Sequence, residues 1–320
     1  MIDVGDYATF LDREYLVTYV RDGGAAVKFV VTPDEDTADA FSAATHAAAA
    51  AAGYLPARVD AASTRVHMID QVFFAVARQV DWDGLAITAV RRALAATAHP
   101  VPEGSDDVSS EAVAAVHGVD AGELSRDVNR QLQMDVQRDY AMIGEFRTAM
   151  LRLCQAQLRT GQVTDAEHAA VLDWLTGDLR QISALRSAMI FRRIGRHNGR
   201  QMLFSLSHWL STNGMAGLVL ELDIRRLGFA RRPRPEERSG VYYTRAALMD
   251  AYELLRQLVD NTDELSNCCV VVVAAPELIT DSNRGVDAYQ ALKLRILDEV
   301  RDRNRDNPYS SLVRLGRAAA

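Results

Sequence analysis

Two short apolar runs are each followed by residues that could take part in nucleotide chemistry. The first run is residues 27–31. A P-loop that binds phosphate reads G-x-x-x-x-G-K-[ST]: its glycine N–H groups wrap the phosphates, its lysine neutralises them and its hydroxyl holds Mg²⁺. Residues 32–39 contain no glycine and no lysine, but they carry four carboxylates, at Asp34, Glu35, Asp36 and Asp39. Because such a loop repels a triphosphate, the segment predicts a nucleotide-binding scaffold whose phosphate site is degenerate.

The second run, residues 217–223, is an apolar stretch that ends in Asp223, which is the form of a Walker B motif. In an active enzyme this aspartate orients Mg²⁺, and a residue beside it positions the attacking water. Ile224 occupies the next position here, so the usual base is missing. The plainer interpretation is a buried strand that happens to end in an acidic residue.

Two arginine clusters are the other groups with possible chemistry. We select seven of these residues as candidate contacts to nucleic acid or to a partner protein: Arg192, Arg193, Arg196, Arg200, Arg231, Arg232 and Arg234. Guanidinium groups bind phosphate, which favours DNA or RNA as a ligand. The alternative is a solvated surface in a chain that uses arginine for nearly all of its basic residues, because only Lys28 and Lys293 are lysine.

Composition excludes several other classes of protein. The net charge of −7 gives no global argument for nucleic-acid binding, and the three cysteines have neither zinc-ligand spacing nor an even count. The histidines show no metal-binding spacing, so no metal site is predicted. No apolar run approaches the roughly 20 residues needed to cross a bilayer, and the first residues do not resemble a signal peptide. We therefore expect a cytoplasmic protein with no membrane contact.

The elements that position these residues are predicted to form an α/β fold. Residues 27–31, 218–222 and 270–274 are unbroken, β-branched-rich runs, typical of central parallel strands buried on both faces. Residues 55–59 form a weaker candidate, because Pro56 favours an edge position. A helix over residues 37–52, stopped by Gly53, connects the first and the edge strand into a βαβ unit.

The domain organisation follows from a change of pattern after the first unit. Residues 99–110 look like a linker, and capping-box spacings at Asp120 and Thr164 predict long helices over 120–158 and 164–190. Further helices are expected at 66–80, 200–212, 244–260 and 288–303. We predict an α/β core in two parts, 1–98 and 194–320, around an all-helical insertion at 99–193.

Several segments taken together resemble the BREX-system ATP-binding protein family. They are residues 23–31, 60–69, 217–223 and 252–261 and the pair Asn307 and Pro308. The resemblance runs over residues 15–315 and is weakest in the helical insertion. It implies a P-loop NTPase-like, AAA+-like fold, as found in bacterial proteins of phage defence.

The resemblance also places the family's ATPase residues on this sequence. The first glycine of the phosphate loop falls on Thr32, its lysine on Ala38 and its Mg²⁺-binding hydroxyl on Asp39. The Walker B aspartate falls on Asp223, and the glutamate that follows it falls on Ile224. These departures argue against ATP hydrolysis, and no cofactor is predicted.

We therefore expect a pseudo-ATPase, a non-catalytic P-loop-like subunit of a bacterial antiviral complex. Its partners would be an intact P-loop ATPase paralogue, other defence-system proteins and a helicase. One alternative is a DNA-binding adaptor that uses the arginine-rich loops. Another is an ATP-binding protein with unconventional contacts, in which Asp223 holds Mg²⁺.

Overall fold

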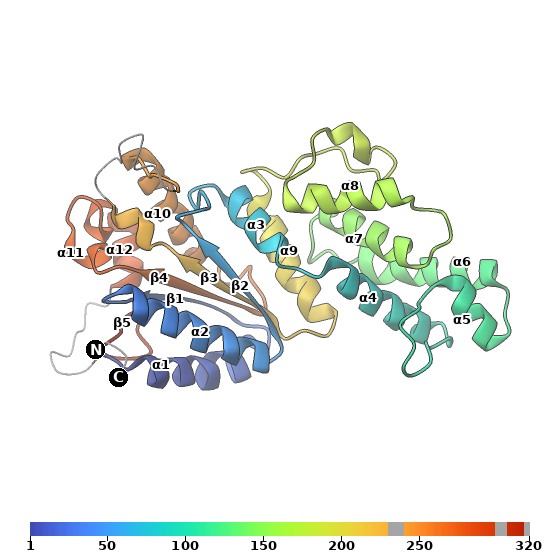
Figure 1. Cartoon of the computed structure of the whole chain (residues 1–320), viewed down its shortest axis with the longest axis horizontal. Coiled ribbons are helices and arrows are strands. Elements are labelled where there is room, and N and C mark those ends of the chain that lie inside the picture. Colours follow the sequence, from blue (N-terminus) through green and yellow to red (C-terminus); the bar gives the residue numbers. More distant parts are fainter. Residues whose placement is uncertain (230–239, 298–305, 317–320) are drawn as a thin grey trace. The chain divides into compact units, whose positions relative to one another are not determined.

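The computed structural model describes residues 1–229, 240–297 and 306–316. The chain forms two compact units: residues 1–76 with 215–320 make the first, and residues 77–214 make the second. The first unit contains the sheet and the second is helical (Figure 1). In the described residues, no helix is long and apolar enough to cross a membrane.

The first unit is built on a five-stranded, all-parallel sheet with strand order β2-β3-β4-β1-β5. Its strands are β1 (Ala25–Val31), β2 (Tyr54–Asp60), β3 (Gly217–Asp223), β4 (Cys268–Ala274) and β5 (Leu312–Arg314). The three predicted central strands are confirmed, and β3 and β4 are buried along their whole length. Strand β2, which contains Pro56, lies at the sheet edge as predicted. Strand β5 was not predicted, because three residues carry no readable periodicity.

The register brings the carboxyl ends of the strands together at one edge of the sheet. Val31 of β1 pairs with Ala274 of β4, and Asp60 of β2 pairs with Asp223 of β3. The chain segments that leave β1, β3 and β4 therefore emerge side by side. Open parallel sheets bind their ligands at this edge, so the candidate site is expected here.

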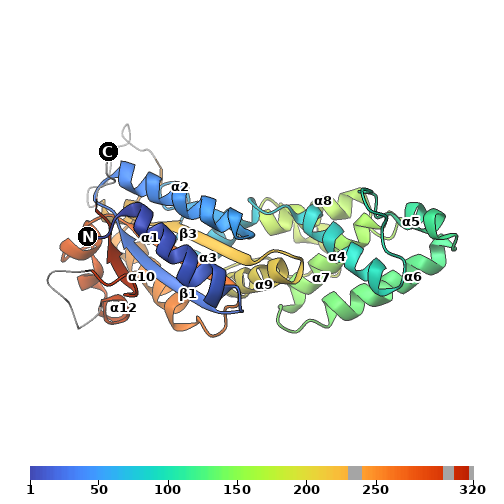
Figure 2. The ribbon, with the colours of Figure 1, turned by 90° about the horizontal axis from the view of Figure 1, so that it is seen from below.

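Helices cover both faces of the sheet (Figures 1 and 2). One face carries α1 (Val4–Leu11), a π-helix (Asp12–Val20) and α2 (Glu35–Ala51), which pack the fully buried Tyr7 and Phe41 against Val30 and Val273. The other face carries α10 (Arg245–Asp260) and α12 (Gln290–Ile296). Thr244 caps the start of α10, because its hydroxyl accepts a hydrogen bond from the backbone N–H of Ala247. The predicted helix at 288–303 ends at Ile296 within the described residues.

A lysine inside central strand β1 has a structural explanation. The Lys28 ammonium donates hydrogen bonds to the backbone carbonyls of Tyr309 (2.8 Å) and Ser310 (3.1 Å) and lies 4.6 Å from the centroid of the Tyr15 ring. Carbonyl and aromatic contacts stabilise a buried cation. Lys28 therefore fixes the segment that leads into β5, and does not bind phosphate.

The second unit is all helical in the residues that the structure describes. After α3 (Ile69–Ala77) the chain continues through α4 (Trp82–Ala96), α5 (Ser110–His117), α6 (Ala121–Leu132), α7 (Gly144–Gln157), α8 (Asp165–Thr176) and α9 (Gly199–Thr212). Trp82 and Phe146 pack edge to face with ring centroids 6.2 Å apart. The helical unit covers more of the chain than the insertion at 99–193 that we expected from the sequence. It also includes α4, which packs on α7, and α9, which belongs to the same helical core.

Two predicted helix lengths were wrong. The pattern over 120–158 is two helices, because a short π-helical turn (Gln133–Gln137) and a bend that includes Asp139 separate α6 from α7. The pattern over 164–190 ends at Thr176, where Gly177 adopts φ 82° and caps α8. A glycine in the left-handed region is a common helix terminator, and Gly177 is such a stop signal in the sequence.

Candidate functional site

The chain between β1 and α2 is too short to form a phosphate loop. Only residues 32–34 connect the two elements. Thr32 remains attached to the end of β4, since its backbone N–H donates to the carbonyl of Ala274 at 3.0 Å. The prediction of an acidic loop was therefore wrong in its geometry: Glu35, Asp36 and Asp39 lie in the first turns of α2. No backbone arch remains that could wrap a phosphate.

A carboxylate of the protein itself occupies the amino end of α2. The Asp34 carboxylate caps the helix by accepting a hydrogen bond of 2.9 Å from the backbone N–H of Thr37. In phosphate-binding proteins the N–H groups at such a helix end receive the ligand. Here Asp34 takes that role, and Glu35 and Asp36 in the first turn add charge that complements the helix dipole. A phosphate would have to displace one carboxylate and approach two more.

The position where the resemblance places the P-loop lysine faces the core. Ala38 is completely buried and packs in the cluster that includes Phe41 and Val30. Asp39, at the position of the Mg²⁺-binding hydroxyl, is more than half exposed. A lysine at residue 38 would point its ammonium into apolar side chains instead of toward the carboxyl edge of the sheet. The difference from a P-loop therefore involves how α2 packs on the sheet as well as which residues it contains.

Asp223, at the end of β3, is enclosed by two arginines. The Arg225 side chain donates to both carboxylate oxygens, with Nε 3.0 Å from Oδ1 and Nη2 2.7 Å from Oδ2. Arg58 from β2 donates to Oδ2 at 3.0 Å. The side chain of Asp223 is 3% exposed. The carboxylate oxygens of Asp223 thus accept hydrogen bonds from guanidinium groups. In an active ATPase, the same oxygens would face Mg²⁺ and its waters.

The ion network extends from Asp223 inward to Glu221. Glu221 is fully buried, and its Oε1 accepts from the Ser42 hydroxyl at 2.6 Å and lies 3.2 Å from Arg58 Nε. His46 Nε2 lies 3.3 Å from the other carboxylate oxygen. Ser42 and His46 project from one side of α2 because they are four residues apart. We call Ser42, Arg58, Glu221, Asp223 and Arg225 the sheet-edge network.

Electrostatics favour the charged forms within this network. Burial by itself raises the pKa of Asp223, but hydrogen bonds and charge from Arg225, with a further bond from Arg58, lower that pKa below its ordinary value. The hydrogen bond to Asp223 is the largest cause that raises the pKa of Arg225. Asp39 contributes more weakly, at 3.7 Å from Arg58 and 3.9 Å from Arg225. The carboxylates and guanidinium groups of the protein thus neutralise one another at this site. In a nucleotide-bound ATPase, Mg²⁺ and phosphate would provide the opposite charges.

A pocket of about 370 Å³ lies at the carboxyl edge of the sheet. Its volume suits a small ligand. Its described lining contains three carboxylates and one guanidinium: Thr32, Pro33, Asp34, Glu35, Arg225, Gly228, Phe229, Ala275, Pro276 and Glu277. Within this described lining, acidic groups outnumber the one arginine, which already bonds Asp223, so this part of the pocket disfavours a polyanion.

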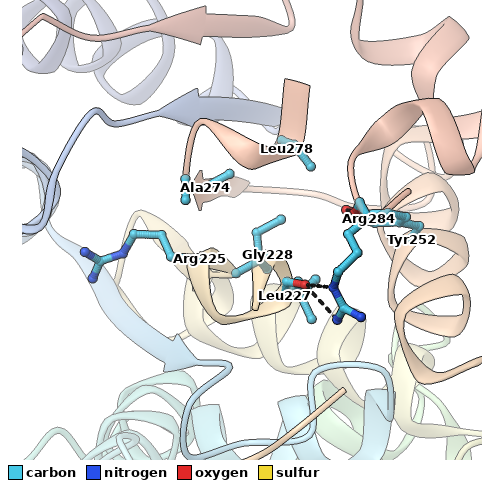
Figure 3. A pocket seen from close by; sticks show the side chains of 9 residues that line it. Arg225, Leu227, Gly228, Tyr252, Ala274, Leu278 and Arg284 are labelled. Atoms are coloured by element: carbon cyan, nitrogen blue, oxygen red, sulfur yellow. Dashed lines mark hydrogen bonds between the residues drawn. The ribbon is translucent and has the colours of Figure 1, made fainter. Parts of the chain in front are cut away.

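A second, much smaller pocket lies behind the segment that follows β3 (Figure 3). Its volume of about 10 Å³ is that of one water molecule at most. Arg284 crosses it and donates from Nε and Nη2 to the carbonyl of Leu227, at 3.0 and 2.9 Å. Arg225 points away from this pocket (Figure 3). The Arg284 contacts therefore close the region, and we assign it no ligand.

Other reactive groups do not assemble into a site. Within residues 1–229, 240–297 and 306–316, no three or more His, Cys, Asp or Glu side chains cluster so as to hold a metal ion. Burial raises the pKa of the Cys154 and Cys269 thiols to about 12, so both stay protonated at neutral pH. They pack as small apolar residues and are not nucleophiles.

The structure describes four of the seven predicted arginine contacts. Arg192, Arg193 and Arg196 lie exposed in the helical unit, between α8 and α9, and Arg200 is half-buried at the start of α9. Arg231, Arg232 and Arg234 lie outside the described residues. Two arginines that follow Asp223 directly are described: Arg225 bonds Asp223, and Arg226 donates to the carbonyl of Val241. These two therefore stabilise the fold.

Sequence reasoning missed Arg58, Ser42 and Glu221. A signal for Glu221 existed, since it precedes Asp223 by two positions and must share its face of the strand. Arg58 gave no such signal, because its place opposite Glu221 depends on the pairing of β2 with β3. Ser42 required knowledge of which side of α2 meets the sheet.

Comparison with known proteins gives one family. The family model described as BREX system ATP-binding protein BrxC/D matches residues 105–318, which is more than half of the chain. The matched region includes β3, Asp223 and most of the helical unit, and it begins after the segment 32–39. No curated protein and no solved structure matches the chain. With the five-stranded parallel sheet, the match confirms the predicted P-loop NTPase-like α/β fold.

Proposed function

Because the chain belongs to the BREX system ATP-binding protein family of phage defence, we propose that it is a non-catalytic, pseudo-ATPase subunit of a cytoplasmic defence complex. One observation carries this proposal. An ATPase directs two features at its nucleotide: the amino end of the first crossover helix and the Walker B aspartate. In this chain, both features are bonded to protein side chains. Asp34 caps the helix, and Arg58 and Arg225 enclose Asp223.

Magnitudes support the loss of nucleotide binding. Removal of the P-loop lysine alone forfeits a charge-assisted contact of about 1.5–3 kcal/mol. Displacement of the Asp34 cap costs about 1 kcal/mol more. Mg²⁺ binding at Asp223 would further require that two guanidinium groups withdraw from a buried carboxylate. These costs add to the repulsion between phosphate and the acidic lining of the pocket.

We infer that the scaffold needs no nucleotide for its stability, which suits a structural subunit. Carboxylates and arginines replace phosphate and Mg²⁺ at the sheet edge, so the fold depends on no bound ligand there. We propose that the chain assembles with an intact P-loop ATPase of the same defence system, and with a helicase or other components. The unconventional ATP-binding alternative would need Asp223 to exchange both of its arginine partners for a metal.

Co-purification tests the proposal. The tagged full-length chain, expressed from its own locus, is isolated and the accompanying proteins are identified and quantified by mass spectrometry. We expect a P-loop ATPase with an intact lysine in a fixed ratio to the chain, and ATPase activity of the complex that Asp223→Asn in this chain leaves unchanged. Isolation of the chain by itself, or loss of the complex's activity in this variant while assembly is intact, contradicts the proposal.

A further inference from the structure

The loop between α8 and α9 is the most basic part of the helical unit. Residues 179–198 contain five arginines and neither aspartate nor glutamate, in a chain of net charge −7. Two large apolar side chains in the same loop are exposed to solvent: Met189 is 65% exposed and Phe191 is 63% exposed. An exposed aromatic group in an arginine-rich segment is an unusual surface for an acidic protein.

The backbone of this loop is held in place, so the exposure of Met189 and Phe191 is not caused by loose packing. Ala188 and Ile190, the neighbours that alternate with them, are buried. Trp174 Nε1 on α8 donates to the carbonyl of Arg192 at 3.0 Å. The loop is thus anchored on alternate residues and presents the others outward.

Met189 adopts a backbone conformation that costs stability. Its φ of 61° lies in the left-handed region, where glycine is favoured and an ordinary side chain is strained. A glycine would serve the turn better if the turn were the only requirement. Because the methionine side chain is mostly exposed, core packing does not explain the presence of methionine at this position either. Residue 189 therefore fits a surface role better than a folding role.

The arginines of the loop lie in the same chain segment as these apolar groups. Arg193 donates to the backbone carbonyl of Arg180 at 2.6 Å, which brings the two ends of the basic segment together. Arg186 and Arg196 are exposed. Arg192, whose side chain is 73% exposed, lies 3.4 Å from Glu145 Oε1, a distance at which an exposed pair is weak. Most of the positive charge thus faces solvent.

We propose that residues 180–196 form a binding surface for single-stranded nucleic acid, on which a base stacks against Phe191 and the arginines contact phosphates. Sequence-independent binders of single strands combine stacking on aromatic side chains with a positively charged path for the backbone. A duplex offers phosphates but no free base face, so it would leave Phe191 and Met189 unused. The proposal concerns the helical unit and holds whether or not the sheet edge binds ATP.

Fluorescence anisotropy with a labelled oligothymidine and the full-length chain tests this proposal. We expect saturable binding at about 50 mM salt that weakens as salt rises, with a log–log slope of about −2 to −3 for three or four phosphate contacts. Phe191→Ala should weaken binding about tenfold through loss of stacking. The pair Arg192→Gln and Arg193→Gln should weaken binding and reduce the slope by about 1.4, because two contacts are lost.

The matched control removes the same charge elsewhere in the unit. Arg126 and Arg130 lie exposed on α6, each beside an acidic residue three positions earlier, and the pair Arg126→Gln and Arg130→Gln should change affinity less than twofold. Circular dichroism confirms that each variant is folded. Absence of binding at low salt, an unchanged affinity in Phe191→Ala, equal weakening in the control, or tighter binding of the duplex would each overturn the proposal. The last two results would indicate general electrostatic attraction or duplex recognition.

Discussion

Single residues decide what the sheet edge does. In our proposal, Ala38, Asp34 and Arg225 each remove one requirement of nucleotide binding: the cation, the free helix end and the free carboxylate. Restoration of one residue does not restore the site, because each replacement is integrated into packing or hydrogen bonding around it. Substitutions at this scale therefore report on stability more than on activity.

Introduction of the P-loop lysine is the first such test. Ala38→Lys should destabilise the protein by about 2–4 kcal/mol, because the enlarged side chain overpacks the core and its ammonium loses water. Ala40→Lys, at an exposed position of the same helix, should change stability by less than about 0.5 kcal/mol. Urea denaturation measures both. If Ala38→Lys is as stable as the control and binds ATP, our assignment of residue 38 to the core is incorrect.

The sheet-edge network predicts coupling between Arg58 and Glu221. Arg58→Met should cost about 2 kcal/mol or more, since Glu221 remains buried without its cation. The cost is less than for a fully buried pair, because the Arg58 side chain is 35% exposed. Addition of Glu221→Gln should recover part of the loss, as this change removes the charge and keeps an acceptor for Ser42. Additive effects in the double-mutant cycle would show that the two residues do not interact.

At the scale of elements, the junction of β1 and α2 is the place where the chain departs from a P-loop. Asp34→Ala should cost about 1 kcal/mol in urea denaturation, because the N–H of Thr37 loses its acceptor. Asp34→Asn should cost much less, since an asparagine oxygen also caps a helix. Equal losses in the two variants would mean that the charge at residue 34 matters and its hydrogen bond does not.

The sequence predicted the elements that have a strong local pattern and missed those fixed by tertiary contacts. The runs that became β1, β3 and β4 were readable because burial on both faces leaves them continuously apolar. Strand β5 could not be predicted, because its pairing with β1 determines it. The orientation of α2 could not be predicted either, because its packing on the sheet determines it. The bend at residues 138–143 lacks glycine and proline, and the N–H of Ile143 bonds Ser205, which is distant in sequence. Gly177 was a local signal that could have been used.

At the scale of the whole molecule, the network makes stability depend on acid pH. The pKa of Asp223 is lower in the folded protein than its ordinary value near 3.8, so this group stabilises the fold above that value. The contribution disappears as the pH falls from there through the folded pKa. Asp223→Asn should thus lower stability at neutral pH and reduce the further loss on acidification. Asp263→Asn, an exposed change of equal charge, is the control; an identical pH dependence in both variants would contradict this role.

The central claim is that the nucleotide site has been replaced by contacts within the protein. Isothermal titration calorimetry of the full-length chain with Mg-ATP tests it most directly. We predict no saturable heat, which corresponds to a dissociation constant above about 1 mM. Micromolar binding that Asp223→Ala abolishes would contradict the account, because it would show that the arginines release the carboxylate to a metal.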